Sequence, residues 1–289
     1  MPMSGTEQKG WKRNDIRCVA LDLDRTTLNA EGKLSLGNRA ALEALLGKGI
    51  QVVIASGRAF ESLPEDVLEL KGIRYAITSN GAAVYSVPEG KCLHQYKIEE
   101  TAVRHILTLL EEEPVSLEAF IGGKAYAPFS YMEDPVRFGA TEQAVDYIRR
   151  TRKGVADIRA FILEHADCLD SMDVVVAEEA LKRRLWEKIK EEEPRVYVTS
   201  SVRQLLELSD YRAGKHSGLR FVLAELGLEP KQAAAFGDAD NDVDMLKLAG
   251  TGIAMENGSE AVKRQADYIT RHHDADGVAY ALREILHLI

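Results

Sequence analysis

The sequence predicts an α/β protein with a doubly wound parallel sheet that is interrupted by an inserted α/β domain. Two observations lead to this prediction. Short apolar runs alternate with helix-like segments near both ends of the 289-residue chain, as in parallel sheets that helices cover on both faces. Between these regions lie roughly 125 residues with a different order of elements, too many for a loop inside a compact domain.

The N-terminal part of the chain has the pattern of successive strand–helix units. Buried strands are expected at residues 17–24, 50–55 and 75–78. Ser35 can cap a helix that runs to about Lys48. A second helix is expected between Ser56 and Leu70. Such units imply parallel strands joined by right-handed crossovers.

The middle of the chain has a different character. A hairpin-like stretch from about residue 84 is followed by a mixture of helices and strands. Helices are expected at 99–113 and 178–192, and strands near 117, near 126 and at 172–177, 195–200 and 204–209. We therefore assign residues 85–209 to the inserted α/β domain.

After Lys215 the alternation of strands and helices resumes. The expected elements are helices at 215–226, from 241 and from 276, and strands at 232–236, 252–255 and 268–270. The core domain is accordingly predicted to comprise residues 16–84 and 210–289. Residues 1–15 are polar and are expected to form an N-terminal tail.

The composition argues against several kinds of partner. With 37 basic and 46 acidic residues the net charge is -9, which disfavours the basic surface that nucleic-acid binding needs. No apolar stretch approaches the roughly 20 residues of a membrane span, and the N-terminus lacks the apolar segment of a signal peptide. Three cysteines without a CxxC pair predict no disulfide framework. We therefore expect a cytoplasmic protein.

The first predicted strand ends in two carboxylates, Asp22 and Asp24. Open α/β sheets bind ligands outside the carboxyl ends of their strands. Because the two carboxylates are only two residues apart, one can attack a substrate while the other transfers a proton. Taken alone, the pair fits equally well with two carboxylates that cap the next turn.

Three residues at other strand or helix ends are candidates for binding phosphate. Ser56 and Gly57 follow the second predicted strand, so a hydroxyl and backbone amides can hold a phosphate oxygen there. Lys215 precedes a helix, and its charge can neutralise a phosphoryl group. On their own, an ordinary helix cap and a solvated lysine are the commoner explanations.

The densest acidic cluster in the chain follows a predicted strand and begins at Asp238. Its hard oxygen ligands suit Mg²⁺ or Ca²⁺. An EF-hand would need glycine at the sixth position and an acid at the twelfth, where this chain has Val243 and Ala249. The cluster therefore indicates a metal at the sheet edge, with Asp238, Asn241 and Asp242 as the candidate residues.

A second group of potential metal ligands, His272 and His273, is set aside. Adjacent side chains diverge on most backbones, and we find no third ligand near them. We expect no metal site at these histidines.

Four motifs follow one another along the chain: Asp-x-Asp-x-Thr from Asp22, Ser-Gly-Arg from Ser56, the isolated Lys215, and Gly-Asp-x-x-Asn-Asp from Gly237. In this order they resemble the motifs of the haloacid dehalogenase superfamily, and most closely those of its Cof-type phosphatases. Supporting segments lie at 79–82, 242–246, 252–257, 266–270 and 276–279. The resemblance implies a Rossmann-like core, over about residues 16–84 and 210–289, with an inserted α/β cap.

The resemblance also implies an activity and a cofactor. Asp22 would be the nucleophile and Asp24 the general acid/base of a phosphatase that forms an aspartyl-phosphate. The implied cofactor is Mg²⁺, held by the Asp22 carboxylate, the Asp24 backbone carbonyl and Asp238, with Asp242 close by.

Other positions follow from the same resemblance. Ser56, Gly57 and Lys215 would bind the phosphoryl group, with Asn241 in support. Further candidates for contact with the substrate are Arg58, Asn80, Lys124 and Arg137. The expected substrate is a small phosphorylated metabolite, either a sugar phosphate or a phosphorylated cofactor, and the sequence leaves the oligomeric state open.

Two departures and two alternatives accompany this interpretation. Arg25 and His216 stand where the family often has glycine, and their roles are left open. A phosphomutase on the same fold could return the phosphoryl group to a sugar. A non-catalytic ligand-binding protein is the other alternative, although Asp22, Asp24 and Lys215 are all present.

Overall fold

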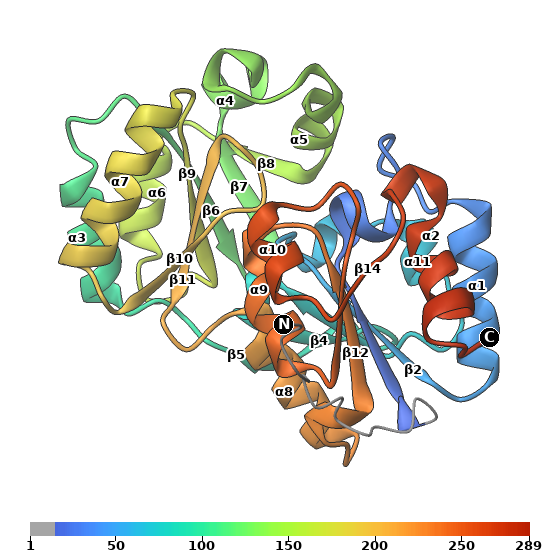
Figure 1. The fold of residues 1–289 in the computed structure, drawn as a ribbon. Helices are drawn as coiled ribbons and strands as arrows, with labels where there is room; N and C mark the ends of the chain where they lie inside the picture. Colours follow the sequence, from blue (N-terminus) through green and yellow to red (C-terminus); the bar gives the residue numbers. More distant parts are fainter. Residues whose placement is uncertain (1–14) are drawn as a thin grey trace, which may run out of the picture.

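The computed structural model describes residues 15–289 and contains two β-sheets (Figure 1). The predicted N-terminal tail, residues 1–15, lies outside the described residues except for Asp15. None of the helices within residues 15–289 has both the length and the apolar composition that a membrane crossing requires.

The first sheet is the doubly wound parallel core that the sequence predicts. In spatial order its strands are β14 (Tyr268–Ile269), β13 (Thr251–Ala254), β12 (Ala233–Gly237), β1 (Cys18–Leu21), β2 (Gln51–Ala55), β3 (Tyr75–Thr78), β4 (Ala83–Ser86) and β5 (Lys91–Gln95). The strands from β14 to β3 run parallel, and β4 and β5 are antiparallel additions at one edge. Strand β1 therefore lies in the middle of the sheet, between β2, which is the next strand along the chain, and β12, which belongs to the C-terminal part of the chain.

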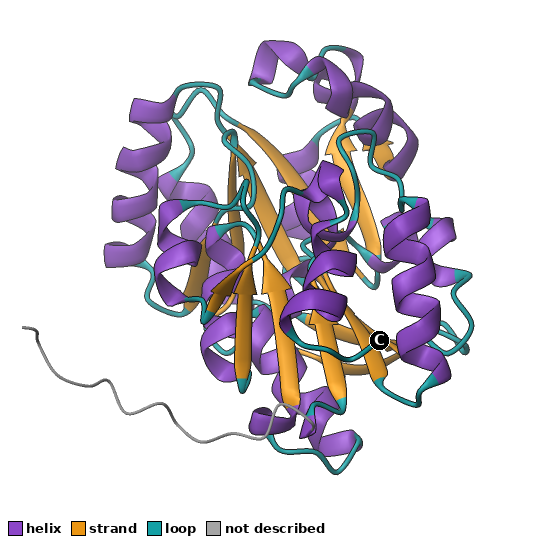
Figure 2. Ribbon diagram, turned by 45° about the vertical axis from the view of Figure 1, so that its right-hand side comes forward, coloured by secondary structure: helices purple, strands orange, loops and turns teal. Residues whose placement is uncertain are grey.

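Helices cover both faces of this sheet (Figure 2). One face packs against α1 (Leu36–Gly47), α2 (Glu65–Leu68) and α11 (Gly277–Tyr280), and the other against α8 (Lys215–Glu225), α9 (Val243–Leu248) and α10 (Glu260–Gln265). Strand β1 shows why both faces are buried, because Val19 and Leu21 enter one core while Cys18 and Ala20 enter the other. The Ser35 side chain caps α1 as predicted, accepting a hydrogen bond from the Asn38 amide.

The second sheet and its helices form a separate layer, which we call the insert. In spatial order its strands are β10 (Val196–Thr199), β11 (Leu205–Asp210), β9 (Ser171–Val175), β6 (Ser116–Ile121), β7 (Lys124–Pro128) and β8 (Arg152–Val155). One face packs against α3 (Glu100–Leu109), α6 (Ile158–Glu164) and α7 (Glu179–Glu192), which lie on the side away from the first sheet (Figure 1). Two short helices, α4 (Phe129–Glu133) and α5 (Val145–Thr151), pack at one end of the opposite face.

The change from one sheet to the other comes later than the sequence indicates. Strand β4 pairs with β3, and β5 pairs with β4, so this hairpin extends the first sheet. The expected boundary between residues 84 and 85 falls inside β4. The hairpin is locally indistinguishable from those of the insert, and only its pairing with β3 assigns it to the core.

The helix expected between Ser56 and Leu70 is broken. The structure has a 3-10 turn at Phe60–Ser62 and the short helix α2, separated by Leu63 and Pro64. Proline lacks an amide hydrogen and disfavours the helical conformation of the residue before it, and Leu63 is extended, with ψ of 143°. Ser56 therefore ends a strand without capping a regular helix.

The turn after β3 brings the backbone against the start of α8. Gly81 has φ of +87°, and a methyl group there would lie 2.0 Å from the carbonyl oxygen of Gly214. Gly227, at the end of α8, has φ of +65° with nothing within 4 Å of such a methyl group. The first glycine is thus constrained by both conformation and space, the second by conformation alone.

We therefore expect Gly81→Ala to be much more destabilising than Gly227→Ala. Gly227→Ala serves as the control, and it should lose about 1 kcal/mol of unfolding free energy from the left-handed backbone at that position alone. Gly81→Ala should lose more than about 3 kcal/mol, because backbone must also move. Urea denaturation of the two variants beside the wild-type protein measures the difference, and equal losses would contradict the close contact.

Candidate functional site

Two aspartates follow the central strands of the first sheet. Asp22 continues β1, and its amide donates a hydrogen bond of 3.1 Å to the Phe236 carbonyl of β12. The Thr27 hydroxyl donates to the Asp22 carbonyl at 2.6 Å and so fixes the turn that follows. Asp238 comes directly after β12, and its Oδ1 accepts a hydrogen bond of 3.2 Å from the Thr26 hydroxyl. Neighbouring parallel strands therefore place both carboxylates at one edge.

The ammonium group of Lys215 joins two of the carboxylates. Its Nζ lies 2.6 Å from Asp22 Oδ1 and 2.6 Å from Asp242 Oδ1, and the lysine side chain is fully buried. The other oxygen of Asp242 accepts hydrogen bonds from the amides of Asp238 and Ala239. Burial acts to lower the pKa of Lys215, but the two aspartates outweigh it and hold the pKa above its ordinary value.

Negative charge exceeds positive charge at this edge. Oxygen atoms of Asp22, Asp238 and Asp242 lie within 4.8 Å of one another, and all three residues are buried. Burial, followed by the charge of Asp242, raises the pKa of Asp238 to about 7. The pKa of Asp22 is also raised, mainly by burial. Three converging carboxylates with one lysine fit a divalent cation, which prefers hard oxygen ligands.

The side chain of Asp24 is not part of that cluster and binds an arginine. Its two oxygens accept hydrogen bonds of 2.9 Å and 2.6 Å from Nε and one terminal nitrogen of Arg58. Although burial acts to raise it, the pKa of Asp24 is lowered, because the charge and hydrogen bonds of Arg58 outweigh burial. The Arg58 guanidinium also stacks on the Tyr147 ring of α5, at 4.4 Å from its centroid. Asp24 is thus linked to the insert through one arginine.

The remaining predicted phosphate-binding residues lie beside these groups. The Ser56 hydroxyl accepts a hydrogen bond of 3.2 Å from the Arg58 amide, and its own hydrogen remains available. Asn241 donates through Nδ2 to Asn80 Oδ1 at 2.9 Å, which joins the loop after β12 to the turn after β3. Asn241 Oδ1 is buried and has no hydrogen-bond partner within residues 15–289. These residues offer both donors and acceptors around the carboxylates.

Four further positions can now be located. Arg25, with φ of +61°, lies 3.8 Å from Asp238 and lines a cleft that also includes the insert loop 200–203. His216 is half-buried on α8, and its ring packs against Gly214. Lys124 pairs with Glu61 at 3.7 Å, and Arg137 is exposed on a turn of the insert. The substrate contacts predicted for Lys124 and Arg137 remain predictions.

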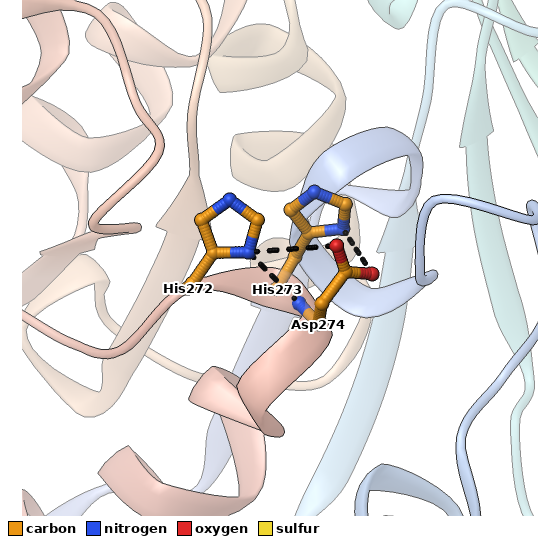
Figure 3. Close-up of side chains that lie close together, drawn as sticks. All are labelled: His272, His273 and Asp274. Atoms are coloured by element: carbon orange, nitrogen blue, oxygen red, sulfur yellow. Dashed lines mark hydrogen bonds and ion pairs between the residues drawn. The ribbon is translucent and has the colours of Figure 1, made fainter.

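The adjacent histidines are closer together than expected. The rings of His272 and His273 stack with centroids 4.4 Å apart, and Asp274 supplies the third potential ligand that we had not expected (Figure 3). However, His272 Nδ1 accepts a hydrogen bond from the Asp274 amide, and His273 Nδ1 lies 3.0 Å from the Leu28 carbonyl. Asp274 Oδ1 accepts from the amide of Ala30. These hydrogen bonds join the loop that contains the two histidines and Asp274 to the loop that contains Leu28 and Ala30, and they account for the cluster without a metal.

One group of polar residues near the site was missed by the sequence interpretation. Glu118, Asp173 and Glu207 are buried in three different strands of the insert. Each stands between two apolar residues in a predicted strand, which is the signal that could have drawn attention to them. Their mutual positions depend on strand register, which the sequence does not provide.

Comparison with known proteins identifies relatives along nearly the whole chain. A family model for haloacid dehalogenase-like hydrolases matches residues 19–282. Phosphatase YwpJ of Bacillus subtilis (strain 168) is 31% identical over 289 aligned residues, covering 94% of this chain and 100% of the relative. From the same organism, 5-amino-6-(5-phospho-D-ribitylamino)uracil phosphatase YcsE is 27% identical, with coverage of 93% and 95%.

Solved structures share the same fold. A haloacid dehalogenase-like hydrolase from B. subtilis superposes with a TM-score of 0.82 at 27% identity, covering 93% of this chain and 100% of the other. A subclass IIB sugar phosphatase superposes with a TM-score of 0.76 at 20% identity, with coverage of 94% and 100%. At that lower identity the second likeness concerns the fold alone.

The carboxylate cluster generates a prediction about stability. Because the folded pKa of Asp238 lies near 7, the folded state keeps a proton that the unfolded state loses above about pH 4. Without a cation, this group therefore makes stability fall as the pH rises from about 4 to about 7. A cation that binds the deprotonated cluster should stabilise the fold increasingly over the same range.

We expect saturating Mg²⁺ to raise the thermal midpoint by about 5 °C at pH 8, and by much less at pH 5. Asp238→Asn should abolish most of this shift. Asp240→Asn is a matched control, because Asp240 is exposed in the same loop. Differential scanning fluorimetry at both pH values provides the measurement. An equal Mg²⁺ shift in wild type and Asp238→Asn would contradict the assignment of the cluster.

Proposed function

Because the chain belongs to the haloacid dehalogenase-like hydrolase family, we propose that it hydrolyses phosphate monoesters of small metabolites. The proposal includes Mg²⁺ as cofactor and an aspartyl-phosphate on Asp22 as intermediate. The observation that carries it is the buried contact of Lys215 with Asp22 and Asp242, at 2.6 Å each. A lysine held against a nucleophilic carboxylate supplies positive charge where phosphoryl oxygens must approach.

In the first step, a carboxylate oxygen of Asp22 attacks phosphorus, and the bond from phosphorus to the leaving oxygen breaks. Asp24 donates a proton to that leaving oxygen. Lys215 screens the charge of the phosphoryl oxygens from the attacking carboxylate. Ser56 and Gly57, after β2, offer a hydroxyl and an amide to the same oxygens.

In the second step, water attacks phosphorus, gives a proton to Asp24 and releases inorganic phosphate from Asp22. Arg58 favours this role, because it lowers the pKa of Asp24 and so keeps a carboxylate ready to accept the proton. In the first step the substrate brings negative charge beside Asp24, which raises its pKa and favours the protonated form. One carboxyl group thereby acts first as an acid and then as a base.

The residues that would hold Mg²⁺ are Asp22, Asp238 and Asp242, together with the backbone carbonyl of Asp24. When bound, Mg²⁺ supplies positive charge that stabilises the phosphoryl oxygens and offsets the repulsion among the carboxylates. Asp22 would have to hold the ion and still keep one oxygen free for attack. The loop after β12 holds Asp242 in place through two backbone amides.

We further propose that the insert acts as a cap that contacts the leaving group. Its Tyr147 already stacks on Arg58, which in turn binds Asp24. The proposed substrates are sugar phosphates or phosphorylated cofactors, and the name of the B. subtilis relative YcsE records a phosphorylated ribitylamino compound as its substrate. A cap that closes over the site would exclude water during the first step and reopen for product release.

The nucleophile assignment predicts that Asp22→Asn lowers phosphate release at least roughly a thousandfold, because an amide cannot form the intermediate. The fold should persist, since the substitution keeps the shape of the side chain. Asp146→Asn, an exposed change on α5, serves as the control. Release of inorganic phosphate from p-nitrophenyl phosphate is the measurement. A folded Asp22→Asn protein with more than a few per cent of wild-type activity would exclude the covalent mechanism.

The acid role of Asp24 predicts a dependence on the leaving group. Asp24→Asn should slow phosphorylation by sugar phosphates roughly 10²- to 10⁴-fold, because an alkoxide needs a proton to leave. An aryl phosphate should be slowed less, since its leaving group is already stable as an anion. Single-turnover kinetics with both substrates separate this step from hydrolysis. Equal losses for the two leaving groups would rule out general acid catalysis by Asp24.

A further inference from the structure

Three carboxylates of the insert form a row across its sheet. Asp173 of β9 is directly opposite Glu118 of β6 on one side and Glu207 of β11 on the other. Directly opposite residues share one face of a sheet, so the three side chains project from the same side. We call Glu118, Asp173 and Glu207 the carboxylate row.

The row lies on the face of the insert that is turned toward the first sheet. The residues that alternate with it, such as Leu117, Met172 and Leu206, pack into the core beneath α3, α6 and α7. Those helices lie on the side away from the first sheet (Figure 1). The carboxylates therefore point in the opposite direction, toward the core domain.

One member of the row has a counter-charge of its own. Glu118 is fully buried and accepts hydrogen bonds of 2.8 Å and 2.9 Å from Arg152. Asp173 and Glu207 are each 4% exposed. No hydrogen bond to the Asp173 carboxylate occurs within residues 15–289. Glu207 Oε1 accepts from the Ser201 hydroxyl at 3.0 Å, but Glu207 Oε2 is buried without any partner in this part of the chain.

The other cations near Glu207 are already engaged. Lys182 donates to Ser200 Oγ at 2.6 Å and to the carbonyls of Val202 and Arg203. Lys215 is shared between two aspartates of the core, as described above. The three carboxylates of the row therefore bind one guanidinium group, that of Arg152, and two of them have no such partner among the described residues. Burial raises the pKa of Asp173 and of Glu207, and for Asp173 the charge of Glu207 adds to this effect.

The row also lies close to the proposed catalytic groups. A methyl group on Gly57 would lie 2.9 Å from Glu207 Oε1, so this carboxylate touches the loop after β2. At the other end, Arg152 and Arg58 both lie over the Tyr147 ring, at 5.1 Å and 4.4 Å from its centroid. Arg152 is near enough to Asp24 to lower its pKa. A leaving group at Asp24 would therefore meet the row.

We propose that the carboxylate row selects a substrate whose leaving group carries an ammonium group, such as a phosphorylated amino sugar or amino alcohol. This inference rests on the proposed phosphatase function and names its substrate class. An ammonium group supplies a positive charge, and it supplies hydrogen-bond donors for the Asp173 carboxylate and for Glu207 Oε2. A leaving group with a carboxylate would add a further negative charge to a buried row that already has too many.

Two sets of matched substrates test the selection. One set is glucosamine 6-phosphate, glucose 6-phosphate and 6-phosphogluconate; the other is O-phosphoethanolamine, 2-hydroxyethyl phosphate and phosphoglycolate. Each set offers an ammonium, a hydroxyl and a carboxylate on frames with the same number of carbon atoms, and 6-phosphogluconate is the one open-chain member of the sugar set. We expect kcat/KM of the ammonium member to exceed that of the hydroxyl member roughly tenfold or more on at least one frame. The carboxylate member should be the poorest substrate of its set.

Neutral variants of the row should reduce this preference. Asp173→Asn and Glu207→Gln should each lower the ratio of ammonium to hydroxyl kcat/KM several-fold, whereas Glu187→Gln on the exposed side of α7 should keep it. The thermal midpoints of the two row variants should stay level or rise, because repulsion between buried carboxylates is removed. A merely structural role would instead lower the midpoints and leave the ratio unchanged.

The outcomes separate this inference from the proposed function. If the wild-type protein hydrolyses p-nitrophenyl phosphate but prefers the ammonium member on neither frame, the carboxylate row does not select amines. The inference is also overturned if Asp173→Asn and Glu207→Gln both leave the ratio of ammonium to hydroxyl kcat/KM unchanged. Absence of p-nitrophenyl phosphate hydrolysis in the presence of Mg²⁺ would instead reject the proposed function itself.

Discussion

The contact of the Lys215 ammonium with Asp22 and Asp242 is the interaction on which the rest of the site depends. It joins three segments that are far apart in the sequence: the end of β1, the start of α8 and the loop after β12. Buried carboxylates without a counter-charge are strongly unfavourable, so removal of this one cation would leave Asp22, Asp238 and Asp242 to repel one another. The excess of negative charge that remains even with Lys215 present is the reason to propose this edge as a site for a divalent cation and a phosphoryl group.

A single arginine connects this centre to the insert. Arg58 binds both oxygens of Asp24 and stacks on Tyr147. Arg152 also lies over that ring and binds both oxygens of Glu118. Charged and aromatic groups therefore alternate from the proposed acid/base to the carboxylate row. Because each contact is short and direct, the position of the insert over the core and the state of Asp24 are physically linked. The side chains proposed for the chemistry and those proposed for the choice of leaving group thus form one contiguous set.

The sequence allowed the core and most of the candidate site to be predicted, because these depend on local signals. Carboxylates at strand ends, a serine that caps α1 and a dense acidic loop are all visible without knowledge of pairing. The hairpin of β4 and β5 was assigned to the wrong side of a boundary, since its partner is set by hydrogen bonds to β3. The helix expected after Ser56 runs through Pro64, which is itself a local signal against a continuous helix. The carboxylate row was missed for a different reason: a shift of one residue in register would move every member to the other face.

The position of β1 between β2 and β12 has a consequence for the order in which the protein is made. The residues that β1 pairs with on one side, such as Ala233 opposite Cys18, are synthesised only after the whole insert has been synthesised. During that interval, roughly ten to forty seconds at usual rates of translation, an unpaired apolar strand edge stays open in the nascent chain. Such an edge is a template for pairing with other chains. The insert, which lies in the sequence between the two halves of the core domain, can fold in the meantime. The proposed nucleophile is thus among the first residues to emerge, yet Lys215, Asp238 and Asp242, which complete the candidate site, come from the last third of the chain.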